Sequence, residues 1–71
     1  MEVRINNYPV EIMLENEKTA KDVVSSIGDW INQKNLIFIG VDIDGDHCNV
    51  DEVPETPVEN IKLINCLVQS R

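Results

Sequence analysis

Carboxylates around one Asp-Gly pair come closest to a chemical motif in this chain. Acidic residues flank Gly45 at Asp42, Asp44, Asp46 and Asp51. Oxygen ligands at alternate positions, followed by a glycine, are typical of a calcium-binding loop. With Gly45 at the required glycine, however, the first ligand position falls on Gly40, which has no side chain, and the last falls on an aspartate instead of the longer glutamate. The pattern predicts a hairpin turn at Asp44-Gly45 with no dedicated metal site, and weak binding of divalent cations stays open as an alternative function.

His47 and Cys48 are adjacent, which suggests a nucleophile with its base. Adjacent residues of an extended segment point to opposite faces, so the two cannot pair, and the chain has no second histidine. The other cysteine, Cys66, lies in an apolar run, and we expect two free thiols with Cys66 buried. The sequence also has no Ser-His-Asp set and no phosphate-binding glycine loop. We therefore predict that the protein is not an enzyme and uses no cofactor.

The net charge of −7 is concentrated in one segment. Residues 42–59 contain seven acids and no lysine or arginine, whereas the remaining six acids and six bases cancel. The seven are Asp42, Asp44, Asp46, Asp51, Glu52, Glu55 and Glu59. Nucleic acids and anionic membranes repel a surface of this sign, so neither is expected as a partner. The segment either keeps a small protein soluble or docks a basic protein partner.

The length of 71 residues predicts one domain, residues 1–71, near the lower limit for a single hydrophobic core. No apolar run approaches the roughly 20 residues that cross a bilayer. The first seven residues lack the apolar stretch of a secretory signal, so a cytoplasmic location is expected.

Alternating apolar residues predict two N-terminal strands, over residues 2–6 and 10–15. Asn6-Asn7-Tyr8-Pro9 forms the turn between them, and Pro9 is expected to stay outside the ladder. A helix follows with Thr19 as N-cap, Asp22 completing a capping box, and Asn35 at its end. Apolar residues at helical spacing predict its buried stripe, namely Ala20, Val23, Val24, Ile27, Trp30 and Ile31.

The second half of the chain predicts mainly strands. A nearly continuous apolar run over residues 36–43 suits an interior strand, and residues 47–50 return after the turn. Pro57 suits the first position of a short helical turn over residues 56–59. The last strand covers residues 61–68, with a break in its alternation at Ile64-Asn65 that suggests a bulge or a change of register. The elements predict an α+β domain of order ββαββ, with one helix across a mixed four- or five-stranded sheet.

This order resembles the β-grasp (ubiquitin-like) fold, and within it the small bacterial sulfur carriers of thiamine and molybdopterin synthesis. The similarity lies in the hairpin Val3-Arg4-Ile5-Asn6-Asn7-Tyr8-Pro9-Val10, the helix start Thr19-Ala20-Lys21-Asp22-Val23-Val24, and the turn Ile43-Asp44-Gly45. Carriers of this kind react through a terminal glycine, whereas this sequence closes with Gln69-Ser70-Arg71. Carrier function would need a reactive tail beyond Arg71, and it stays an alternative only.

The leading functional prediction is a small, acidic, non-catalytic module that binds a protein partner. The acidic segment 42–59 is one candidate surface, and an exposed patch from Tyr8, Met13 and Phe38 is another. A free edge strand offers a third route, by strand addition to a partner or to a second copy in a homodimer.

Overall fold

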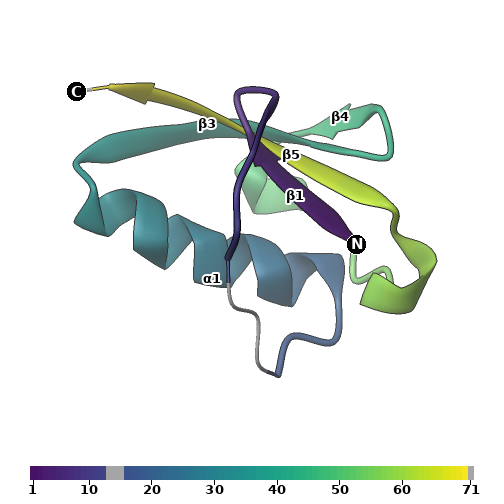
Figure 1. Cartoon of the computed structure of the whole chain (residues 1–71). Coiled ribbons are helices and arrows are strands. Elements are labelled where there is room, and N and C mark those ends of the chain that lie inside the picture. The colour runs from purple at the N-terminus through teal and green to yellow at the C-terminus, as the bar shows by residue number, and fades with distance from the viewer. Residues whose placement is uncertain (13–15, 71) are drawn as a thin grey trace.

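Five strands form one sheet, and one α-helix packs across a face of it in the computed structural model, which describes residues 1–12 and 16–70 (Figure 1). The main elements are β1 (Glu2–Ile5), β2 (Tyr8–Pro9), α1 (Ala20–Gln33), β3 (Leu36–Ile43), β4 (Asp46–Cys48) and β5 (Leu63–Ser70). Two 3-10 turns lie between β4 and β5, namely η1 (Val50–Glu52) and η2 (Val58–Asn60). This confirms the α+β class with a mixed sheet and one helix, an arrangement compatible with a β-grasp-like fold.

The strand order is β2-β1-β5-β3-β4, so the last strand lies in the middle of the sheet. β5 pairs in parallel with β1 and antiparallel with β3, while both hairpins are antiparallel. Ile64 and Cys66 belong to the core, and Asn65 between them is bonded to Asn7 of the β1–β2 turn, so all three are buried in succession. The register of β5 with β1 and β3 is regular through Ile64 and Asn65, so the bulge or register change expected there is wrong. The register shifts on β3 instead, between Phe38 and Gly40.

The helix begins as predicted. The Thr19 hydroxyl accepts a hydrogen bond from the Asp22 amide, and the Asp22 carboxylate accepts one from the Thr19 amide. The buried residues of α1 are Ala20, Val23, Val24, Ile27 and Ile31. Trp30, however, is 37% exposed, contrary to the expectation that it belongs to the core. At 3.6 residues per turn it lies about 80° from the centre of the buried stripe, where its ring stacks under the Lys34 ammonium, 5.6 Å from the ring centroid.

Both predicted turns have the backbone that their residues favour. Asn6 and Asn7 have φ of 51° and 70°, and Asp44 and Gly45 have φ of 50° and 90°. The second strand differs from the prediction, because β2 consists only of Tyr8 and Pro9, and residues 10–12 are not in a strand. Pro9 nevertheless pairs with Arg4. Proline has no amide N–H to donate, and this is tolerated because β2 is an edge strand with a neighbour on one side only. The rest of the predicted second strand, residues 13–15, lies outside the described residues.

The segment between β4 and β5 is tied to the start of α1. The Ala20 amide donates to the Thr56 carbonyl at 2.8 Å, and the Val58 amide donates to the Lys18 carbonyl at 3.0 Å. The helical turn predicted near Pro57 is present as η2, with Pro57 one position before its first residue. η1 was not predicted. η1 carries Asp51 and Glu52 of the acidic segment, and η2 carries Glu59.

Candidate functional site

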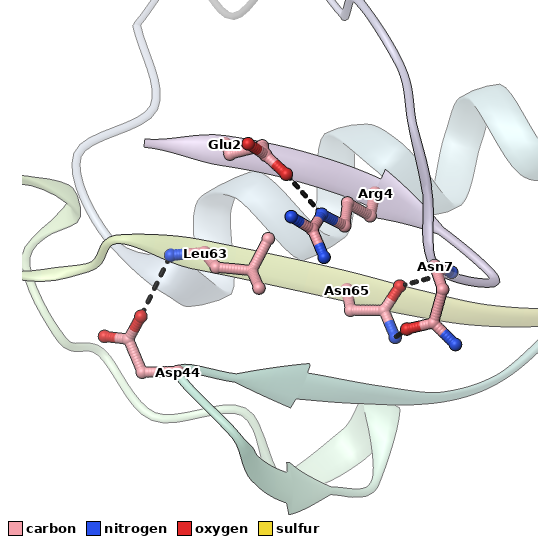
Figure 2. Close-up of polar contacts among 6 residues, drawn as sticks. All are labelled: Glu2, Arg4, Asn7, Asp44, Leu63 and Asn65. Atoms are coloured by element: carbon pink, nitrogen blue, oxygen red, sulfur yellow. Dashed lines mark hydrogen bonds and ion pairs between the residues drawn. The ribbon is translucent and has the colours of Figure 1, made fainter.

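The face of the sheet opposite α1 is mainly polar near β1 and apolar near the start of β3. Arg4 and Asn65 point away from the helix, and Arg4 forms an ion pair with Glu2 (Figure 2). On β3, Ile37 and Ile39 are 41% and 53% exposed. The apolar run that indicated an interior strand is therefore covered on one side only over its first half.

His47 and Asp42 form a polar pair beside these isoleucines. They are register partners in β3 and β4, with 2.8 Å between Nδ1 of His47 and a carboxylate oxygen of Asp42. The imidazole lies over Gly40, where a Cβ would come within 2.8 Å of its Cε1. Gly40 thus provides the space in which His47 reaches Asp42.

Cys48 lies on the opposite face of β4 from His47, as the sequence predicted, and packs against the core. Burial raises the pKa of its thiol, and the nearby carboxylates of Asp42, Glu52 and Asp46 raise it further. Burial alone raises the pKa of Cys66 to about 12. Both cysteines are free thiols and are held in the protonated, unreactive form at neutral pH.

Asp44 has a structural partner. One of its carboxylate oxygens accepts hydrogen bonds from the backbone amides of Lys62 and Leu63, at 3.0 and 2.9 Å (Figure 2). These bonds join the β3–β4 turn to the start of β5, a contact that no sequence pattern indicated. Among residues 1–12 and 16–70, no three His, Cys, Asp or Glu side chains are placed to hold a metal ion. The structure confirms the hairpin turn that was predicted at Asp44-Gly45.

The remaining five acids of segment 42–59 are solvent-exposed. They are Asp46, Asp51, Glu52, Glu55 and Glu59, and we call them the acidic surface. None of them forms an ion pair with another part of the described chain. Their carboxylates therefore face solvent without an ion pair in the described residues, whereas the carboxylates of Asp42 and Asp44 are hydrogen-bonded.

A second polar contact that sequence reasoning missed fixes the β1–β2 turn on β5. The Asn65 side chain accepts from the Asn7 amide at 2.9 Å and donates to the Asn7 side chain at 3.0 Å (Figure 2). The Asn6 side chain accepts a hydrogen bond from the Val68 amide and donates one to the Val68 carbonyl. The signal was present, because Asn65 is a polar residue within an apolar run and is only 5% exposed.

The residues of the predicted aromatic patch are not brought together. Tyr8 lies on edge strand β2 and is 76% exposed, whereas Phe38 lies on β3, with β1 and β5 between the two strands. Phe38 also turns towards the helix, where its ring is 3.7 Å from the position of a Cβ on Gly28. Met13 lies outside the described residues.

No helix in the described part of the chain is both long and apolar enough to cross a membrane. The model of a family described as the TP0873 N-terminal domain matches residues 1–70. No curated protein and no solved structure matches the chain.

Proposed function

The chain belongs to the TP0873 N-terminal domain family, and from that premise we propose that it is a non-catalytic interaction module, an adaptor or a subunit, that binds a basic protein partner. The acidic surface is the docking site in this proposal. We further propose that the fold is of the β-grasp type, which the order of the elements and the parallel pairing of β1 with β5 support.

The observation that carries the proposal is uncompensated charge. Five carboxylates are exposed without an ion pair and lie within one segment that has no lysine or arginine. Bringing like charges together in a chain of net charge −7 opposes folding. A partner with lysines and arginines would relieve that repulsion and would be steered to this surface at low salt.

The test is capture of partners from the lysate of the source cell by the tagged chain, read by mass spectrometry. The full variant carries Asp51→Asn, Glu52→Gln, Glu55→Gln and Glu59→Gln. Asp42 and Asp44 are left unchanged, because both carboxylates have structural partners.

Two double variants separate the effect of where a charge lies from the effect of the total net charge. Glu55→Gln with Glu59→Gln removes two charges from the acidic surface, whereas Glu2→Gln with Glu11→Gln removes two exposed charges elsewhere, of which Glu2 is paired with Arg4. We expect a partner of high pI to be lost with the first pair and kept with the second, and to dissociate as salt is raised. Equal retention by the full variant and the native chain would refute docking at this surface.

A further inference from the structure

One edge of the sheet is open along half of β3. β5 pairs with β3 from Leu36 to Ile43 except at Ile39, where the register shifts, but β4 pairs only with the last three residues of β3, Val41 to Ile43. After Cys48 the chain leaves the sheet and turns into η1, which contacts β3 but is not one of its strand partners (Figure 1). Within residues 1–12 and 16–70, no strand pairs with residues 36–40 on the side away from β5.

The open edge presents a specific chemistry. In an antiparallel ladder, alternate residues turn both backbone groups towards the same neighbour. The register shift at Ile39 interrupts this alternation once, and the backbone groups of residues 36–40 that do not face β5 face the open side. Five strand residues span about 16 Å. Ile37 and Ile39 are the exposed apolar side chains on this stretch. An extended backbone is the one partner that pairs with such a row of donors and acceptors.

A hollow on the helix side of this edge adds charge to the site. It lies between α1 and η1 and has a volume of about 320 Å³, with Val24, Gly28 and Val53 among its lining residues. Asp29 and Asp51 also line it. The Phe38 ring reaches Gly28, which places the hollow beside the open stretch of β3. Lys21, its one cation, is seven residues before Gly28, about 10 Å along the helix.

We propose that residues 36–40 of β3 accept an extended strand of the partner protein, in which apolar residues alternate with lysine or arginine. The partner strand occupies the track that β4 leaves free, and its cationic side chains lie near Asp29 and Asp51. The inference rests on the proposed function and adds the mode of binding. A second copy of this chain is the less favourable occupant, since each copy has a net charge of −7.

The probe is a capped heptapeptide, Lys-Val-Lys-Val-Lys-Val-Lys, titrated into the ¹⁵N-labelled chain. Two further peptides keep its side chains and charge but are N-methylated on the valines or on the lysines. In an added strand, either the valine amides or the lysine amides point at β3, but not both sets. We expect saturable shifts and slower hydrogen exchange for amides of residues 36–40, with one methylated peptide bound at least about tenfold more weakly and the other nearly unchanged.

Protein variants provide the matched control. Ile39→Thr removes exposed apolar surface beside the open edge and should weaken binding of the heptapeptide severalfold. Tyr8→Thr removes exposed apolar surface at the opposite edge of the sheet and should leave binding of the heptapeptide unchanged. Both positions are exposed, so both variants should fold.

Three outcomes would overturn the inference. Equal binding of all three peptides, with shifts only at the acidic surface, would leave the proposed function standing and remove strand addition. Absence of binding by any of the three peptides at low salt would count against both the proposed function and strand addition. A concentration-dependent dimer that protects residues 36–40 without peptide, seen by sedimentation, would assign the edge to a second copy.

Discussion

Replacing Asp44 tests whether this acidic residue is structural. Its carboxylate oxygen accepts from two backbone amides, of Lys62 and Leu63, and its own φ is +50°. Asp44→Ala removes both bonds, each worth about 0.5–1.5 kcal/mol net. It also forces alanine into a left-handed conformation that costs about 1–2 kcal/mol. The expected loss is about 3 kcal/mol in the free energy of unfolding.

Asp44→Asn is the matched control. Asparagine tolerates positive φ, and its side-chain oxygen can accept from the same two amides, so only the charge-assisted part of the bonds is lost. We expect a loss of about 1 kcal/mol or less. Urea unfolding followed by far-UV circular dichroism measures both values, and the alanine variant should also lower Tm by about 12–24 °C. A structural role for the Asp44 carboxylate is refuted if Asp44→Ala lowers the free energy of unfolding by less than about 1 kcal/mol, or if Asp44→Asn lowers it as much as Asp44→Ala does.

Three other predictions concern stability. Gly28→Ala should raise the free energy of unfolding by about 0.5–1 kcal/mol, because the added Cβ meets Phe38 at an ordinary 3.7 Å in mid-helix; lower urea stability would contradict this. The folded-state pKa of Cys66, about 12, lies above the usual 9.0, so the unfolded state loses its proton first. Stability from this thiol is intact below pH 9 and falls as pH rises towards 12, by up to about 1.4 kcal/mol per pH unit, and Cys66→Ala should flatten the measured slope over that range. Asn65→Ala should lower the free energy of unfolding by about 2–3 kcal/mol, because it leaves the Asn7 amide without its partner. Amides of the β1–β2 turn should also exchange hydrogen faster. Unchanged exchange in the turn would show that the contact between Asn65 and Asn7 is dispensable.

Contacts between distant residues explain most of the differences between prediction and structure. Pro9 joins a strand because that strand is at the edge, a fact that depends on the order of the whole sheet. Trp30 fits the apolar pattern of its helix but lies beyond the width that the sheet covers. The acidic segment was visible as a cluster, yet the structure separates Asp42 and Asp44, which have partners, from the five acids that do not.

The sequence by itself determined the features whose energetics are local. Thr19 and Asp22 cap the helix within one turn, and Asn6-Asn7 and Asp44-Gly45 adopt positive φ because their own side chains permit it. Tertiary structure alone decided which strand lies in the middle of the sheet, which backbone amides donate to the Asp44 carboxylate, and where β4 ends. Those features depend on contacts between residues far apart in the chain. The Asp44 side chain accepts from the Leu63 amide 19 residues away, and the Asn6 side chain accepts from the Val68 amide 62 residues away. The open edge of β3 belongs to this second kind, since it exists only because the chain turns away into η1 after Cys48.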